Sequence, residues 1–216
     1  MHISNGVDVE KFRPRGVSLD PARGPFVVGF VGGSHPHHDI PTVLQAVKIA
    51  RDKRIPLRLR IVGHAALVAR WRELARRLNI DAVVDFVAPV PHDQVPAELR
   101  RMSVCVIAYL RQTIVQSDGV TAATKLWECW ASRRPVIATD VPSSSSYTFH
   151  FNRCYLAVSP ENPEEMAEAI ELLYKDPDLA EELATNGYQY VADGHSWTDA
   201  ARQIDHVLNR VLQDRP

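Results

Sequence analysis

The chain has 216 residues, of which 45% are hydrophobic and 24% are charged, and its formal net charge is −1. That composition is ordinary for a globular protein, and the length allows a sizeable core. The balanced charge argues against a general affinity for nucleic acids or anionic membranes, and no apolar run approaches the length of a membrane span.

Short apolar runs alternate with helical patterns along most of the chain. The runs are rich in large and β-branched apolar residues, which is typical of buried strands, and the segments between them repeat apolar residues every three or four positions. Strands are predicted at 26–31, 57–62, 83–87, 104–109, 136–139 and 154–158, and helices at 42–53, 65–78, 91–101, 121–132, 162–175, 178–192 and 197–212.

This order predicts an α/β fold: a Rossmann-like, doubly wound parallel sheet of about six strands with helices on both faces. Residues 25–195 are expected to form this single domain. Residues 1–24 are interpreted as a linker, because Asn5-Gly6 is a turn signal, and the chain begins as though another segment should precede it. Residues 196–216 hold a last helix, which Ser196 is expected to cap.

Two of the predicted strands end in glycine just before a helix. Gly32, Gly33 and Ser34 follow the first strand, and Gly63 follows the second. Glycine lets backbone N–H groups approach a ligand closely, and helix N-termini favour anions such as phosphate. Ligands of such sheets bind beyond the carboxyl ends of the strands. The strict dinucleotide fingerprint is absent, since no third glycine follows at the required place, so NAD binding is disfavoured.

The predicted helix at 121–132 is amphipathic. A carboxylate beside a threonine and a lysine on its polar side suits a ligand, but the same pattern fits the solvent face of an ordinary helix. Lys125 likewise suits either a phosphate contact or the plain surface. The apolar side carries Ala122, Leu126, Trp127 and Trp130, and the polar side carries Thr121, Thr124, Glu128 and Ser132, with Lys125 at its edge.

Three histidines, at positions 35, 37 and 38, follow the first glycine turn. Their spacing matches no helical metal motif, so no metal is predicted. A phosphate contact by one imidazole and a plain solvent loop both remain open. The three cysteines, Cys105, Cys129 and Cys154, are far apart along the chain, and the first two lie in apolar elements, which favours buried thiols and a cytosolic protein.

Several short motifs occur in an order and spacing that resemble one protein family. They are Asn5-Gly6-Val7-Asp8 with Phe12-Arg13-Pro14, VGFVG at 28–32, IVG at 61–63, the segment 85–99, Lys125-Leu126-Trp127-Glu128 with RPVIAT at 134–139, and Ser196-Trp197. From Ile3 to about Leu212, this succession resembles the C-terminal, donor-binding half of the GT-B-fold retaining glycosyltransferases, most closely family four, the glycosyl transferases group 1.

The resemblance implies a site for a nucleotide-sugar donor. It implies that Glu128 accepts hydrogen bonds from ribose hydroxyls, that backbone N–H groups of the glycine turn and near Ala123 face the diphosphate, and that residues near Ala88 lie beside the base. The segment 36–39 is similar to a PWHG loop found in part of the family, which makes His38 the implied phosphate contact. The predicted donor-binding residues are Gly32, Gly33, Ser34, His38, Gly63, Ala88, Ala123, Thr124, Lys125 and Glu128.

The implied activity is that of a retaining hexosyltransferase, which moves a sugar from a nucleotide diphosphate sugar to an acceptor and needs no metal or further cofactor. Val120 stands where the family has a second carboxylate, eight residues before Glu128, so no catalytic residue is predicted. Members with the KLxE version of the motif also lack that carboxylate, so its absence does not exclude activity. A non-catalytic nucleotide-binding or interaction module, or a remnant of a glycosyltransferase, is the alternative. An epimerase of similar fold would need carboxylates in the cleft that the sequence does not offer.

In this family an N-terminal domain holds the acceptor, and the resemblance covers only the donor half. We therefore expect little activity without a missing or separate N-terminal acceptor domain. The expected location is cytoplasmic, with peripheral attachment at the inner membrane face as the alternative. The last helix is expected to leave apolar residues without cover and to promote self-association or a mobile end. These residues are Ile204, Val207, Leu208, Val211 and Leu212.

Overall fold

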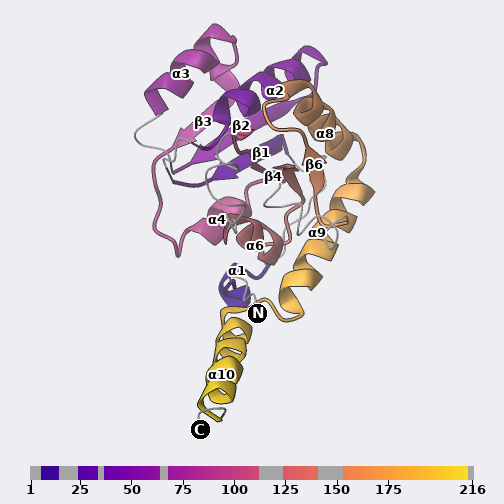
Figure 1. Cartoon of the computed structure of the whole chain (residues 1–216). Coiled ribbons are helices and arrows are strands. Elements are labelled where there is room, and N and C mark those ends of the chain that lie inside the picture. The colour runs from indigo at the N-terminus through magenta and orange to yellow at the C-terminus, as the bar shows by residue number, and fades with distance from the viewer. Residues whose placement is uncertain are drawn as a thin grey trace.

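A computed structural model describes residues 6–14, 24–33, 37–63, 68–111, 124–140 and 153–213 of the chain. Its centre is a six-stranded parallel sheet in the order β3-β2-β1-β4-β5-β6 (Figure 1). The strands are β1 (Phe26–Val31), β2 (Leu57–Val62), β3 (Val84–Val87), β4 (Val104–Ile107), β5 (Val136–Thr139) and β6 (Leu156–Val158). The prediction of a Rossmann-like, doubly wound sheet is confirmed.

Helices cover both faces of this sheet (Figure 1). In β4, Val104 and Val106 join the core cluster on one face, while Cys105 and Ile107 join the cluster on the other. This is why the strand is apolar at every position, as strands buried on both faces are. The first face is covered by α2 (Ile40–Asp52), α3 (Val68–Arg77) and α8 (Pro163–Lys175), and the second by α4 (Val95–Leu99) and α6 (Thr124–Ala131).

The first described residues pair with the turn that precedes the last helix. Val7 forms a parallel bridge with Ser196, and both Val7 and Phe12 of α1 (Val9–Phe12) are buried in the second cluster. The turn at Ser196 joins α9 (Pro177–Ala192) to α10 (Trp197–Gln213). The predicted division of the chain at residues 24 and 195 stays a prediction.

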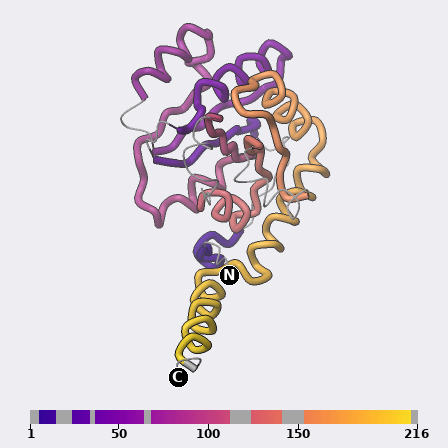
Figure 2. The backbone as a smooth tube through the Cα atoms, in the orientation of Figure 1, coloured from indigo at the N-terminus to yellow at the C-terminus, as the bar shows by residue number. Residues whose placement is uncertain are grey.

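The last helix extends away from the body of the molecule (Figure 2). Its apolar stripe is exposed to solvent, as the sequence predicts, with Val207 partly covered. The exposed large apolar side chains of α10 are Trp197, Ile204, Leu208, Val211 and Leu212. Within the described residues, no helix is both long and apolar enough to cross a bilayer.

Several predicted boundaries shift. The helix expected from residue 42 starts at Ile40, because the Asp39 side chain accepts a hydrogen bond from the Thr42 amide at 3.2 Å and caps it. The helix expected over 91–101 is only α4, and Pro96 rather than Pro91 occupies its first turn. A 3-10 turn, η2 (Asp81–Val83), precedes β3. The fourth and sixth strands are shorter than expected.

The end of α6 corrects one side-chain prediction. Ser132 was expected on the polar side of the helix, but it is buried. The helix ends at Ala131, and Arg133 then adopts a left-handed backbone conformation with φ of 51°. The Ser132 amide still donates to the Glu128 carbonyl at 3.0 Å, so the residue keeps the helical register, and its burial comes from the chain packed around the helix end, where the Arg134 amide folds back to the Cys129 carbonyl.

We predict that Gly187→Ala destabilises the protein. A Cβ at this position of α9 would lie 2.3 Å from Cδ1 of the fully buried Trp130, so one of the two must move. An alanine normally stabilises a helix relative to glycine, whereas overpacking costs about 1–3 kcal/mol. Urea unfolding should show a net loss in the free energy of unfolding. Gly24→Ala, where a Cβ would meet nothing within 4 Å, should be close to neutral, and greater stability of Gly187→Ala would contradict this packing.

Candidate functional site

The site lies where the sheet changes its winding direction. Strands β1 and β4 are neighbours in the sheet, but the helix after β1 covers one face and α6 covers the other. The carboxyl ends of two such strands leave a crevice in which ligands of this fold class bind. In this protein that edge carries Gly32 and Gly33 after β1, and Tyr109 after β4.

Two glycines bring the strand ends together. The Gly32 amide donates to the Val62 carbonyl at 3.1 Å, and the Gly63 amide donates to the Val87 carbonyl at 3.1 Å. Gly63 has a φ of +104°, and a Cβ there would lie 2.6 Å from the Gly32 oxygen. A Cβ at Gly32 would lie 2.8 Å from the Lys125 ammonium nitrogen. A side chain at Gly63 would therefore collide with the backbone of the first glycine turn, and one at Gly32 would displace the Lys125 ammonium group.

His38 lies buried at the bottom of this edge. Its Nδ1 is 3.1 Å from the Gly33 carbonyl oxygen, and its Nε2 is 2.7 Å from the Nζ of Lys125. A carbonyl only accepts hydrogen bonds, so Nδ1 carries the proton and Nε2 accepts from the ammonium group. An isolated bridge between His38 and Tyr109 ties the loop after β1 to the end of β4.

Lys125 places an ammonium group at this edge. Its Nζ lies 4.7 Å from the centre of the Phe30 ring and 5.6 Å from that of Tyr109, which are cation–π distances. Burial among these groups lowers the pKa of Lys125 to about 8, although Cys129 and Glu128 act in the opposite direction. A partly desolvated ammonium group of this kind attracts an anion more strongly than a surface lysine does.

Glu128 lies one turn further along α6 and is 18% exposed in its side chain. Its Oε1 is 2.7 Å from Nε2 of His92. Thr124 is exposed at the start of the same helix. Trp127 and Trp130 are buried on the opposite side, as the helical pattern predicts. The helix thus presents a hydroxyl, an ammonium group and a carboxylate along one side.

The remaining predicted residues line the same edge or lie outside the described chain. Gly63 and Ala88 follow β2 and β3, next to one another in the strand order, and Ala88 is exposed. Ser34 and Ala123, together with Val120, fall outside the described residues. Of the three histidines, His37 and His38 are described, and their ring centres are 4.5 Å apart.

The sequence did not suggest two contacts of the site. His92, in the loop after β3, is the hydrogen-bond partner of Glu128, and Lys11 of α1 is in turn 2.9 Å from His92 Nδ1. The place of His92 in the loop after a predicted strand could have indicated that it lies near the site, since the loops at the carboxyl ends of the strands meet at one edge of the sheet. Nothing in the pattern around Lys11 indicated its part.

The comparisons with known proteins agree with this architecture. Residues 25–176 match the family described as "Glycosyl transferases group 1". The chain is 24% identical to the D-inositol 3-phosphate glycosyltransferase of Corynebacterium kroppenstedtii, with 88% of this chain and 42% of that protein aligned. It is 27% identical to D-inositol 3-phosphate glycosyltransferase 2 of Catenulispora acidiphila, with 98% and 51% aligned. The chain thus spans about half the length of these relatives or less.

Solved structures share the fold. Anabaena HepE in complex with UDP and glucose superposes with a TM-score of 0.79 at 16% identity, over 96% of this chain and 56% of that one. The C-terminal domain of the glycosyl transferase group 1 family protein LpcC from Francisella tularensis has a TM-score of 0.71 at 18% identity, over 89% of this chain and 100% of that one.

We predict that anion binding here weakens as the pH rises through about 8. The pKa of Lys125 is about 8, so its positive charge is lost above that pH, whereas a phosphate group is fully ionised from about pH 7. Calorimetric titration with phenyl phosphate, a phosphate monoester, should give about a tenfold loss of affinity between about pH 7.5 and pH 9.5. The Lys125→Met variant should bind the anion weakly, and its affinity should not depend on pH in this range. Lys48→Met, which removes a surface ion pair with Asp52, should keep it; an unaltered profile in Lys125→Met would refute the assignment.

Proposed function

The chain belongs to the glycosyl transferases group 1 family, and we propose that it is the donor-binding half of a retaining glycosyltransferase of the hexosyltransferase type. It would hold a nucleotide diphosphate sugar, from which the sugar passes to an acceptor. The observation that carries the proposal is the meeting of Lys125, His38 and Glu128 at the carboxyl edge of β1 and β4. The Lys125 ammonium group, which His38 supports, and the Glu128 carboxylate, both on α6, match the diphosphate and the ribose of a nucleoside diphosphate.

The diphosphate would lie between the glycine turn and the start of α6. Backbone N–H groups at a glycine turn and at a helix N-terminus favour phosphate, and Lys125 adds a full charge to them. His38 supports that lysine through Nε2. When the bond to the sugar breaks, negative charge grows on the leaving diphosphate, and fixed donors at this position stabilise it. The donor substrate itself supplies the activated sugar, so the proposal requires no metal or further cofactor.

The ribose would lie against Glu128. A carboxylate offers two oxygens and about four lone-pair positions, enough to accept from two adjacent hydroxyls. Among the described residues, His92 is the one hydrogen-bond partner of this carboxylate, at Oε1. In the proposed complex, Oε2 would accept from the ribose hydroxyls.

We further propose that an N-terminal acceptor domain completes the enzyme and that transfer by this half alone is slow. A cleft with one wall cannot align donor and acceptor, and alignment supplies much of the rate. The exposed apolar stripe of α10 suits such a domain, and without it the stripe suits a second copy of the chain. The three free, buried cysteines fit a cytoplasmic location.

A non-catalytic nucleotide-binding module is the second candidate. Val120 is the position that raises it, because part of the family carries a carboxylate eight residues before Glu128 that would contact the sugar and this chain does not, while members with the KLxE motif lack it as well. Both candidates require nucleotide binding, and transfer to an acceptor separates them.

Nucleotide binding tests the proposal directly. Calorimetric titration with UDP, GDP and ADP should show binding of at least one, and Glu128→Gln should weaken it about tenfold, because ribose hydroxyls then lose a charged acceptor. Glu182→Gln, an exposed change on α9, should have no effect. The proposal fails when none of the three nucleotides binds, or when Glu128→Gln binds as tightly as the unaltered chain.

The exposed stripe of α10 generates a separate expectation. The unaltered chain should associate with itself as its concentration rises, because burial of Leu208 and its neighbours removes apolar surface from water. Sedimentation equilibrium should show this association, and Leu208→Glu should abolish it. His206→Glu, on the polar side of the same helix, should leave it unchanged. A monomer at every concentration would exclude self-association.

A further inference from the structure

The N-terminal segment reaches the nucleotide site. In α1, the Lys11 amide donates to the Asp8 side chain at 3.0 Å, and Phe12 is almost fully buried. The cap and the buried ring fix the short helix beside α6. Lys11 therefore projects from a fixed backbone, although it belongs to a segment that the sequence suggested was only a linker.

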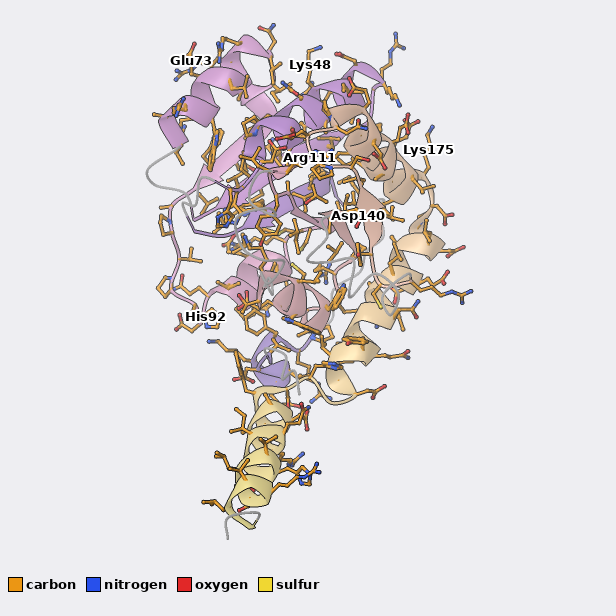
Figure 3. All side chains as sticks on the ribbon, in the orientation of Figure 1. Lys48, Glu73, His92, Arg111, Asp140 and Lys175 are labelled. Carbon is orange, nitrogen blue, oxygen red and sulfur yellow. The ribbon has the colours of Figure 1, made fainter. Side chains whose placement is uncertain are left out.

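A chain of two hydrogen bonds runs from this lysine to the site. Lys11 Nζ is 2.9 Å from His92 Nδ1, and His92 Nε2 is 2.7 Å from Glu128 Oε1. Figure 3 shows His92 at the edge of the domain, close to α1. The ring centres of Phe12 and His92 are 5.6 Å apart, so the imidazole also packs on the buried aromatic side chain.

The order of donors fixes the tautomer of the imidazole. An ammonium group has three N–H donors and no acceptor, so Nδ1 of His92 must accept and carries no proton. The ring proton is then on Nε2, where it points at the carboxylate of Glu128. In many metal sites and catalytic sites, the hydrogen bond made by one ring nitrogen of a histidine likewise decides whether the other nitrogen carries the proton.

We propose that His92 is a positioning residue for the nucleotide site, and that Lys11 keeps it in the tautomer that holds Glu128. This role rests on the proposed function, since Glu128 is the group that would accept from the ribose. A glutamate side chain loses several rotamers when it binds a ligand, and that loss weakens binding. Fixing Oε1 in advance reduces the loss and leaves Oε2 directed at the ligand.

The tautomer can be measured without any ligand. In long-range ¹H–¹⁵N spectra recorded at about pH 8, where free imidazole is neutral, His92 should carry its proton on Nε2. Lys11→Met should convert it to a mixture of the two tautomers. Lys53→Met, which removes a similar exposed lysine paired with Glu171, should leave the His92 signals unchanged. A proton on Nδ1, or no response to Lys11→Met, overturns the proposal.

The effect of His92 on binding can be measured with ligands that carry or lack the ribose hydroxyls. The probes are UDP, 2′,3′-dideoxy-UDP and pyrophosphate, with GDP or ADP and its dideoxy form in place of the UDP pair where one of those is the nucleotide that binds. His92→Ala should weaken UDP binding about threefold to tenfold and leave the other two probes unchanged, since they lack the hydroxyls or the whole ribose. His92→Gln keeps an N–H donor near the position of Nε2 and should restore UDP binding. His206→Ala, remote on α10, is the matched control.

The outcomes separate this proposal from the one on which it rests. Two results would show that His92 has no positioning role while the donor site stands. In both, Glu128→Gln weakens UDP binding, and His92→Ala binds UDP either as tightly as the unaltered chain or more tightly. A loss of all three probes in His92→Ala and in His92→Gln alike would mean that the change disturbs the fold, and it also counts against the specific role. Where the unaltered chain binds neither pyrophosphate nor any of UDP, GDP and ADP, both proposals fall.

Discussion

The placement of α6 depends on two buried tryptophans. The Trp127 ring stacks at 15° on His195, with centres 5.2 Å apart, and at 19° on Tyr190, with centres 5.7 Å apart. Trp130 donates its indole N–H to the Cys154 carbonyl at 3.0 Å. Each indole contributes on the order of 3 kcal/mol by its burial. Since these contacts fix the rotation of α6 about its axis, they also fix where its polar side chains point, which is toward the carboxyl edge of the sheet.

That rotation places a lysine where water cannot fully solvate it. The ring faces of Phe30 and Tyr109 and the Nε2 of His38 replace part of the lost hydration of Lys125, and the pKa of about 8 reflects the part that they do not replace. An arriving diphosphate would supply the missing counter-charge. The free energy that the empty site loses through desolvation would then be recovered on binding, which is the usual conflict between stability and function at a binding site.

Periodicity predicted the sheet and the buried side of α6, because both follow from which faces of an element meet the core. It failed at Ser132, where the helix ends and the backbone turns. It could not predict the partners of Glu128. His92 lies 36 positions away in the sequence, and Lys11 lies 81 positions before His92. Such contacts depend on how loops meet after folding, and no local pattern records them. The glycine turns and the polar side of α6 were singled out by their own chemistry, whereas the roles predicted for them at a donor site came from the order of the motifs.

The base of α10 and the N-terminal segment form one unit, and this unit contacts α6 twice. Val7 exchanges backbone hydrogen bonds with this base, donating to the His195 carbonyl at 3.1 Å and accepting from Trp197 at 3.2 Å. The His195 ring stacks on Trp127, and the hydrogen bonds that begin at Lys11 end at Glu128. In the proposed enzyme, an acceptor domain seated on α10 would therefore act on both contacts. Its position would bias the orientation of α6, so that closing the cleft and aligning the donor carboxylate would be a single change rather than two.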